Sequence, residues 1–344
     1  MKIIYFLIYL LWGVFPLEAA IAYKVWTKPL NQTVHVLEID PQKYQVLLVK
    51  AKESGTGLET VQSMQARYGS MAGVNGGFFK SNGSPAGALK IDGQWYTGAA
   101  DERGAVAWNA GGKDCHFGRF TVGFHLHSKG KEIPIDALNT PLEEGQVVMY
   151  TPVYALSTLT TPAAKELVIK DGIILEVRKG GRRAEIPQNS IVIAFGRNQL
   201  AQIEDLKEGD KAELIEKYSD EVWGKYKNIL GGAPLLIENG IIVEDISKEN
   251  VHSTFLELRH PRTALGVKKN GSWLFVLVEG RKLGQSKGAT IKELAEYMKE
   301  LGCQYALNLD GGSSSTFVVE NKEIKGAHGS VSELVSNAVL IIPK

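Results

Sequence analysis

The sequence contains little cysteine and no excess of either charge. It has two cysteines in 344 residues, Cys115 and Cys303, and no Cys-x-x-Cys pair, which excludes the usual zinc and redox motifs. Lysine and arginine (39) nearly balance aspartate and glutamate (38), so nothing indicates a nucleic-acid partner. We expect both cysteines to be separate buried thiols, and we expect neither a cofactor nor a metal.

Long apolar runs are also missing, except at the N-terminus. After Lys2, the uncharged segment Ile3–Leu17 is 15 residues long, short of the roughly 20 that span a bilayer, and Ala20-Ile21-Ala22 offers a cleavage site. The sequence therefore predicts a signal peptide at residues 1–22 and an exported mature chain, periplasmic or secreted, without a membrane span. An uncleaved N-terminal anchor is the alternative.

Two segments have helix signals. Thr56 and Glu59 fit a capping box for a helix ending at Gly69, and Thr290 and Glu293 fit another for a helix ending at Gly302. Short strands separated by glycine-containing turns are predicted elsewhere, the best of them at 147–150, 166–169, 173–177 and 191–195. The predicted fold class is α+β, with a strand-rich mixed sheet and two main amphipathic helices. No linker is visible, so we interpret residues 23–344 as one domain.

The two predicted helices begin similar units. Each helix is followed by a glycine, a strand, an asparagine and a Gly-Gly pair, at Asn75-Gly76-Gly77 and at Asn308-Leu309-Asp310-Gly311-Gly312. A third pair, Gly231-Gly232, interrupts another apolar run. Glycine lets a ligand approach the main chain closely, so we expect the three loops to converge on one cleft.

Four motifs in this order resemble the phosphodiester glycosidase family: Asn75-Gly76-Gly77-Phe78-Phe79, Gly231-Gly232-Ala233-Pro234-Leu235, Arg262-Thr263-Ala264-Leu265-Gly266-Val267 and Asn308-Leu309-Asp310-Gly311-Gly312-Ser313-Ser314. The chain departs from the family pattern at Ser313, where a third glycine is usual, and at Glu279-Gly280-Arg281, where Asp-Gly-Arg is usual. An arginine often found before the last strand is also missing. The resemblance implies an exported hydrolase that cleaves the sugar C1–O bond of a glycosyl-1-phosphodiester, leaving free sugar and a phosphate monoester. It implies a sugar phosphodiester or phosphoglycan as the substrate.

This chemistry assigns expected roles to the motif residues. Asp310 is the first candidate for base or nucleophile, Glu279 is the second carboxylate, and Asn75 can orient water. Arg262 is the expected phosphate partner, because its planar fork matches two oxygens. The remaining substrate-binding candidates are Thr263, Gly76, Gly77, Phe79, Gly231, Gly232, Asn308, Gly311, Gly312, Ser313 and Ser314; among these, the glycines and serines of the first and last loops are candidates to hold phosphate through backbone amides.

Other interpretations stay open. A glycan- or phosphoglycan-binding protein without catalysis could use the same fold, since a fold does not fix a function. The serines at 313–315 could belong to a serine hydrolase, but the Gly-x-Ser-x-Gly motif is missing. The sequence leaves open the sugar, the aglycone, the stereochemical outcome and which carboxylate acts as acid.

Overall fold

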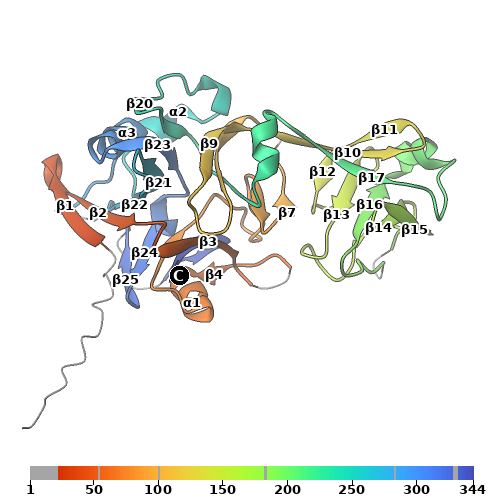
Figure 1. Ribbon diagram of the computed structural model, residues 1–344, viewed down its shortest axis with the longest axis horizontal. Coiled ribbons are helices and arrows are strands. Elements are labelled where there is room, and N and C mark those ends of the chain that lie inside the picture. Colours follow the sequence, from red (N-terminus) through yellow and green to blue (C-terminus); the bar gives the residue numbers. More distant parts are fainter. Residues whose placement is uncertain (1–21, 53–54, 100, 182–183, 283, 328–331) are drawn as a thin grey trace, which may run out of the picture.

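The computed structural model describes residues 22–52, 55–99, 101–181, 184–282, 284–327 and 332–344. The predicted signal peptide lies outside these residues, except for Ala22. Figure 1 shows a main body that carries both chain ends of the described part, and a smaller lobe on the right, formed by strands β10–β17.

The largest sheet has seven strands, in the order β1-β2-β22-β21-β23-β19-β20, and its neighbouring strands are all antiparallel. Its members are β1 (Ala22–Lys28), β2 (Gln32–Ile39), β19 (Leu235–Glu238), β20 (Ile241–Ile242), β21 (Arg262–Lys268), β22 (Trp273–Val278) and β23 (Cys303–Asn308). Helix α3 (Ile291–Glu300) packs on one face through Ile291, Leu294, Ala295 and Met298. This burial matches the predicted apolar face of the helix.

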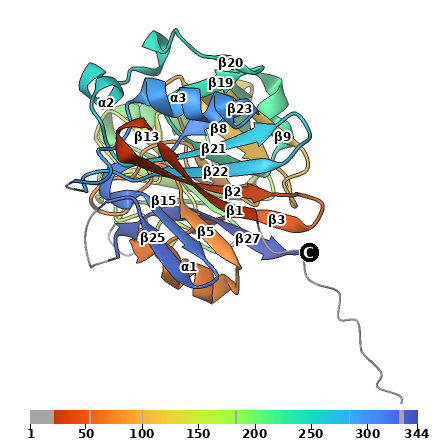
Figure 2. The ribbon, with the colours of Figure 1, turned by 90° about the vertical axis from the view of Figure 1, so that its left-hand side faces the viewer.

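A second antiparallel sheet packs on the opposite face, in the order β25-β24-β5-β27-β3. Its members are β3 (Tyr44–Lys50), β5 (Ala72–Asn75), β24 (Thr316–Val319), β25 (Lys322–Lys325) and β27 (Asn337–Pro343). Helix α1 (Val61–Tyr68) covers its outer face through Val61 and Met64. Figure 2 shows the resulting layers: α3, the seven-stranded sheet, the five-stranded sheet and α1. The ends of β5 and β23 therefore meet between the two helix-covered sheets.

A third sheet, β7-β6-β18-β8-β9, connects the body to the lobe. Its members are β6 (Leu89–Ile91), β7 (Gln94–Thr97), β8 (Arg103–Trp108), β9 (Cys115–Phe120) and β18 (Asn228–Gly231). The lobe holds the sheet β11-β10-β17 and the sheet β12-β13-β16-β14-β15. Its strands are β10 (Val122–Ser128), β11 (Lys131–Ile135), β12 (Ala137–Leu138), β13 (Val147–Tyr150), β14 (Lys165–Lys170), β15 (Ile173–Lys179), β16 (Ile191–Phe195) and β17 (Glu213–Tyr218).

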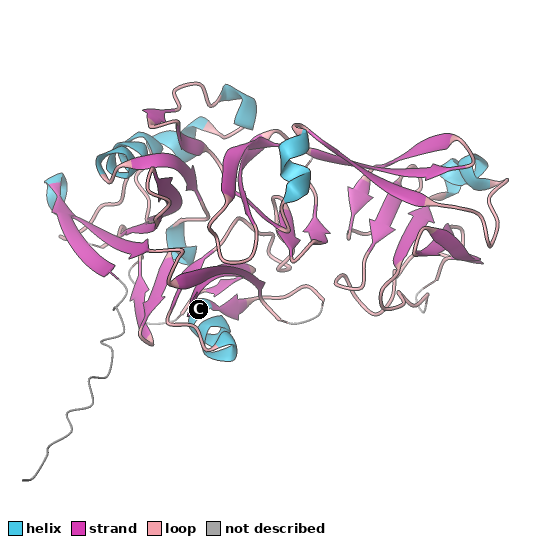
Figure 3. Cartoon of the chain, viewed as in Figure 1, coloured by secondary structure: helices cyan, strands magenta, loops and turns pink. Residues whose placement is uncertain are grey.

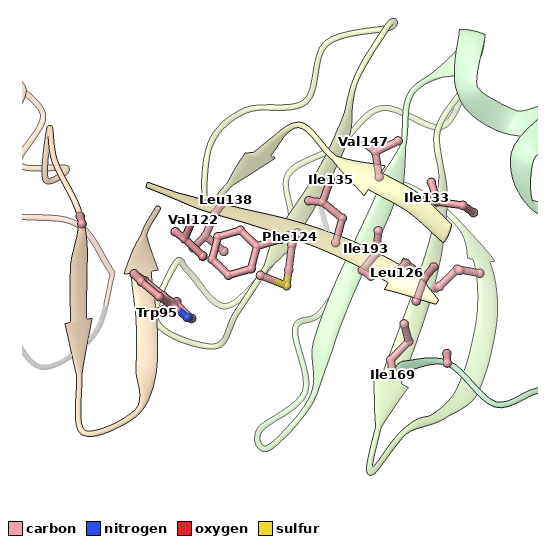
Figure 4. Close-up of a cluster of buried hydrophobic side chains, with 14 of the residues drawn as sticks. Trp95, Val122, Phe124, Leu126, Ile133, Ile135, Leu138, Val147, Ile169 and Ile193 are labelled. Atoms are coloured by element: carbon pink, nitrogen blue, oxygen red, sulfur yellow. The ribbon is translucent and has the colours of Figure 1, made fainter. Parts of the chain in front are cut away.

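One buried cluster joins the lobe to the third sheet (Figure 4). Trp95 of β7 packs edge-on against Phe124 of β10, with ring centroids 5.4 Å apart. The same cluster continues into the lobe through Leu126, Ile169 and Ile193. The lobe and the third sheet therefore share one hydrophobic core, and the interpretation of residues 23–344 as one domain stays a prediction.

The strand-rich α+β class is confirmed (Figure 3). The predicted strands at 147–150 and 191–195 coincide with β13 and β16, and those at 166–169 and 173–177 lie within β14 and β15. The expected mixed sheet is found only in the lobe, where the short strand β12 pairs in parallel with β13. The two large sheets of the body are antiparallel although each contains a helical crossover. Helix α3 connects β22 to β23 across β21, and α1 connects β3 to β5 across β27, so one antiparallel strand separates the two strands that each helix connects.

The second helix is predicted correctly and the first is displaced. Thr290 and Glu293 form the predicted capping box of α3. The predicted box of Thr56 and Glu59 does not form, because α1 begins four residues later, with Thr60 as its N-cap. Glu59 instead accepts hydrogen bonds from Lys52 N (3.0 Å) and Arg67 Nη2 (2.7 Å). A short helix, α2 (Ser253–Glu257), and a two-stranded pair of β4 (Glu59–Thr60) and β26 (Leu334–Val335) complete the described elements.

Cys115 and Cys303 are separate free thiols, as expected, but only Cys303 is fully buried and Cys115 is partly exposed. Burial raises the pKa of each to about 12, so both thiols stay protonated and unreactive at neutral pH. In the part of the chain that the structure describes, every helix is too short or too polar to cross a bilayer.

Candidate active site

The three Gly-Gly loops meet as predicted, although of the three glycine pairs only Gly231-Gly232 lines the cleft beside them. Asp310 N donates to Gly76 O (3.2 Å), and Asn75 Nδ2 donates to Asp310 O (2.8 Å), which joins the first loop to the last. Asn308 Nδ2 donates to Ala233 O (2.6 Å), which joins the Gly231-Gly232 loop to the strand end that precedes Asp310. A Cβ atom on Gly77 would lie 2.5 Å from Gly231 O, so only glycine permits this approach.

Asp310 carries the carboxyl group at this junction. Its side chain is largely buried, and burial raises the pKa of the carboxyl to about 6. Hydrogen bonds from Ser314 and from Gly311 N, the latter 2.9 Å from Oδ1, lower this pKa by less than burial raises it. Neither donor brings a positive charge, so the desolvation of the carboxylate dominates. The carboxyl is therefore mostly ionised at neutral pH and protonated in mild acid.

Asn75, predicted to orient water, and Thr263, predicted to bind substrate, both occupy structural positions. Both side chains are fully buried. Asn75 Oδ1 accepts hydrogen bonds from Thr263 Oγ1 (2.8 Å) and Thr316 N (3.1 Å), while Nδ2 donates to Asp310 O. The amide of Asn75 therefore links the two large sheets and holds the main chain of Asp310, and it leaves no group for a substrate.

Arg262 does not have its predicted role as the phosphate partner. Its side chain is 1% exposed, Nε donates to Ala289 O (2.9 Å), and Nη2 donates to the carbonyls of Phe255 (2.7 Å) and Leu258 (2.9 Å). Burial, followed by the charge of Arg281, lowers its pKa to about 10. Arg262 therefore fixes helix α2 to the sheet, where the ring of Phe255 covers its guanidinium at 4.6 Å.

Glu279 lies in a chain of hydrogen bonds rather than free in the site. Its Oε1 lies 2.9 Å from His35 Nε2, whose other ring nitrogen contacts Tyr23 Oη at 2.6 Å, and Oε2 lies 2.8 Å from Lys282 Nζ. Burial alone would raise the pKa of Glu279, but the bonds from His35 and Lys282 outweigh burial and lower it. A carboxylate that stays ionised in two ion pairs is unsuited to be a general acid, so the predicted catalytic role of Glu279 is not supported.

Apart from that of Ser313, the backbone amides of the predicted phosphate cradle already have acceptors inside the protein. Gly76 N and Gly77 N donate to the backbone and side-chain oxygens of Asn337, and Gly311 N donates to Asp310. The other amides with acceptors inside the protein are those of Gly231, Gly232, Gly312 and Ser314. Ser313 is exposed and keeps its side chain available for a ligand. Asn308 is fully buried, and its Oδ1 has no protein partner.

A cleft of about 230 Å³ opens beside the loops. Phe78, Gly231 and Gly232 line it together with Arg103. Phe78 also packs edge-on against Phe255, with ring centroids 5.9 Å apart. Phe79, the predicted sugar contact, packs instead against the cluster under α1, because successive side chains point in opposite directions. A larger cleft of about 790 Å³ borders the lobe, but no motif residue lines it.

Sequence reasoning overlooked four residues near the loops: Arg103, Phe255, Arg281 and Asn337. Arg281 belongs to the Glu279-Gly280-Arg281 motif, and a charged residue next to Gly280 could have indicated a binding residue. Asn337 lies at the start of β27 and holds Gly77, a contact between segments 260 residues apart. Phe255 and Arg103 lie outside the motifs, so no local pattern indicated them.

Solved structures show the class of fold. A hypothetical protein from Synechocystis superimposes with a TM-score of 0.79 at 24% identity, over 94% of this chain and 61% of that chain. A protein of Burkholderia pseudomallei K96243, whose name refers to export, gives a TM-score of 0.74 at 24% identity, over 91% of this chain and 74% of that chain. At this level of identity the likeness shows the fold alone.

The sequence comparisons identify the family. The family model of phosphodiester glycosidases matches residues 164–342, just over half of the chain. The chain therefore belongs to the phosphodiester glycosidase family.

Curated relatives match in part. The N-acetylglucosamine-1-phosphodiester alpha-N-acetylglucosaminidase of Bos taurus is 28% identical over 154 residues, 42% of this chain and 27% of that protein. An uncharacterised protein of Rickettsia conorii is 32% identical over 143 residues, 39% of this chain and 47% of that protein. The matched segments span less than half of the length of either relative.

Proposed function

We propose that the protein is an exported hydrolase that cleaves the sugar C1–O bond of a glycosyl-1-phosphodiester and releases free sugar and a phosphate monoester. The observation that carries the proposal is the largely buried carboxyl of Asp310, held at the junction of three Gly-Gly loops. Family membership supports the same reaction class, and the bovine relative is named for a phosphodiester substrate.

A single free carboxylate is sufficient for this bond. The departing phosphate monoester is already an anion, so it leaves without a proton from a general acid. Ordinary glycosides need a second carboxyl group for that proton. Asp310 then acts at C1, either as the nucleophile or as the base that activates water, while Glu279 stays in its ion pairs with His35 and Lys282.

The direct test is release of a phosphate monoester. The purified chain without residues 1–22 is incubated with a panel of sugar-1-phosphodiesters that differ in sugar and aglycone, and products are followed by phosphorus NMR. We expect a new monoester signal together with equimolar free sugar. Cleavage on the other side of phosphorus, giving sugar-1-phosphate, would contradict the proposed bond.

The pH dependence of the reaction follows from the pKa of Asp310. Because the ionised carboxylate is the active form, kcat/KM should be flat above about pH 7 and fall about tenfold per unit below the pKa of about 6. The profile is measured with the best substrate of the panel between pH 4.5 and 8.5, in buffers of constant ionic strength. A rate that instead rises below pH 6 would assign Asp310 the opposite role, as a proton donor.

A further inference from the structure

The guanidinium of Arg281 lies on the loop that follows Asp310. A Cβ atom on Gly312 would lie 3.4 Å from Arg281 Nη2, 3.7 Å from Nη1 and 3.8 Å from Cζ, so the planar group lies over the space that a side chain at 312 would fill. Gly312 has φ +65°, a conformation that favours glycine. Arg281 itself is exposed. The contact thus places an accessible cation beside Gly312, whose Cα atom is at most roughly 7 Å from the Cα atom of Asp310.

His260 adds a second donor beside Arg281. Arg281 Nη2 lies 3.1 Å from His260 Nδ1. A guanidinium can only donate, so Nδ1 is the acceptor and the ring hydrogen must be on Nε2. Burial, followed by the charges of Arg262 and Arg281, lowers the pKa of His260 and keeps the ring neutral at pH 7. The imidazole therefore orients Arg281 and presents an N–H group of its own.

The charges around this point are unbalanced. Arg262 and Arg281 lie close enough to His260 to lower its pKa, and the charge of Arg281 also lowers the pKa of Arg262. Within the described residues, no salt bridge joins any of the three to a carboxylate. The neighbouring carboxylate of Glu279 is paired with His35 and Lys282. A cluster of donors without a protein anion is the arrangement that binds phosphate oxygens.

The backbone holds Arg281 in an uncommon conformation. Its φ is +57°, a region that residues other than glycine rarely adopt. The flanking residues fix it, because Gly280 N donates to Gly326 O (2.8 Å), Lys282 N donates to Ser286 O (3.1 Å), and Glu279 is held by its ion pairs. Local strain that surrounding contacts maintain is typical of functional sites. The chain of Tyr23, His35 and Glu279 thereby contributes to the position of Arg281.

We propose that Arg281 and His260, on the exposed side of Gly312 and Ser313, bind the phosphate group of the substrate, in place of the buried Arg262. The inference rests on the proposed function for the identity of the substrate, but the anion site itself does not depend on catalysis. Bound there, the phosphate places the sugar C1 next to Asp310. Arg281 recognises two oxygens through its planar fork, and the aglycone extends toward solvent over Ser313.

Binding of inorganic phosphate tests the site without turnover. Isothermal titration calorimetry compares the wild-type chain with R281M, R281K, R103M and R197M at matched ionic strength, up to 50 mM phosphate. Arg197 is an exposed arginine of the lobe and serves as the matched control. We expect R281M to weaken binding at least about tenfold, R281K to lie between, and R197M to match the wild type. Wild-type affinity in R281M, or loss of binding in R103M alone, would overturn the inference.

Turnover separates this inference from the proposed function. With an active diester, R281M should raise KM at least about tenfold, because the phosphate contact is present before and during the reaction. If no diester is cleaved but R281M still loses phosphate affinity, the anion site stands and the reaction is wrong. If diesters are cleaved while R281M retains both KM and phosphate affinity, the reaction stands and the site is wrong. Thermal unfolding of every variant confirms that each is folded.

Discussion

Replacing Asp310 with asparagine should reduce turnover at least about 100-fold, the loss that follows removal of a general base or nucleophile. Asparagine has nearly the same shape, and its oxygen can still accept the hydrogen bond from Gly311 N, which is 2.9 Å from Oδ1 in the wild type. The variant therefore removes the charge and leaves the loop in place. Phosphorus NMR of wild-type and D310N chains with the same diester measures the effect, and unchanged turnover would remove Asp310 from its proposed role.

The same variant should be more stable than the wild type at neutral pH. Burial raises the pKa of Asp310 from 3.8 to about 6, so the folded chain holds the proton more tightly than the unfolded chain does. The stability that this proton contributes is complete below about pH 4 and is lost as the pH rises through 6. A shift of about two units corresponds to at most about 3 kcal/mol.

Denaturant unfolding at two pH values isolates this effect. D310N should exceed the wild type in the free energy of unfolding at pH 7.5, and the difference should shrink toward pH 4.5 as the wild-type carboxyl regains its proton. Other carboxylates contribute equally to both chains and cancel. A D310N chain less stable than the wild type at pH 7.5 would mean that its lost activity reflects misfolding.

Ligand binding by D310N also separates an enzyme from a binding protein. If Asp310 acts at C1, the variant should still bind the intact diester and leave it intact, whereas the wild type consumes it. If both chains bind the diester and neither cleaves it, the interpretation as a phosphoglycan-binding protein on this fold takes precedence.

Local patterns predicted the loops and the fold class correctly, because glycine pairs, capping boxes and alternating strands are short-range signals. The capping box at Thr290 and the strands β13 and β16 are examples. The box predicted at Thr56 failed because tertiary partners compete for the carboxylate of Glu59, which binds Arg67 and Lys52 N. A sequence pattern does not contain that competition.

Side-chain roles were harder to predict than loop positions. Arg262 was expected to face the substrate, but its guanidinium donates to the carbonyls of Phe255, Leu258 and Ala289, and no motif indicates these contacts. Phe79 was expected to contact the sugar, but it packs under α1, whereas its neighbour Phe78 lines the cleft. The partners of Glu279, namely His35 and Lys282, come from two separate segments. The motifs therefore predicted where the candidate site lies, whereas the burial and hydrogen-bond partners of each side chain determine which role it can have.

The repeated helix-strand unit explains how the site is built. Strand β5 follows α1 and strand β23 follows α3, and the two strands lie in different sheets. Their last residues, Asn75 and Asn308, nevertheless meet around Asp310 and the Gly231-Gly232 loop. The side chain of Asn75 is fully buried and makes hydrogen bonds with three segments distant in sequence, at Thr263, Thr316 and Asp310. The position of the Asp310 carboxyl thus depends on contacts between the two sheets, to which the buried amide of Asn75 contributes.

Replacing Asn75 with alanine should therefore reduce both stability and activity. The substitution leaves Thr263 Oγ1, Thr316 N and Asp310 O buried without their partner. Each unpaired buried group costs about 1–3 kcal/mol, so we expect the free energy of unfolding to fall by roughly 3 kcal/mol or more. N198A, at an exposed asparagine of the lobe, is the matched control and should stay within about 0.5 kcal/mol of the wild type.

Kinetics of the folded Asn75→Ala chain distinguish a positioning role from direct contact with substrate. At a temperature where the variant is fully folded, kcat should fall while KM changes little, because Asn75 touches Asp310 and not the ligand. An N75D chain keeps the acceptor for Thr263 and Thr316 but loses the donors to Asp310 O and Gly76 O and places a buried carboxylate against these carbonyls, so it tests the donor side of Asn75. If KM rises and kcat is unchanged in both variants, Asn75 contacts the substrate after all. If N75D retains wild-type kcat, the bond to Asp310 O does not set the position of the carboxyl.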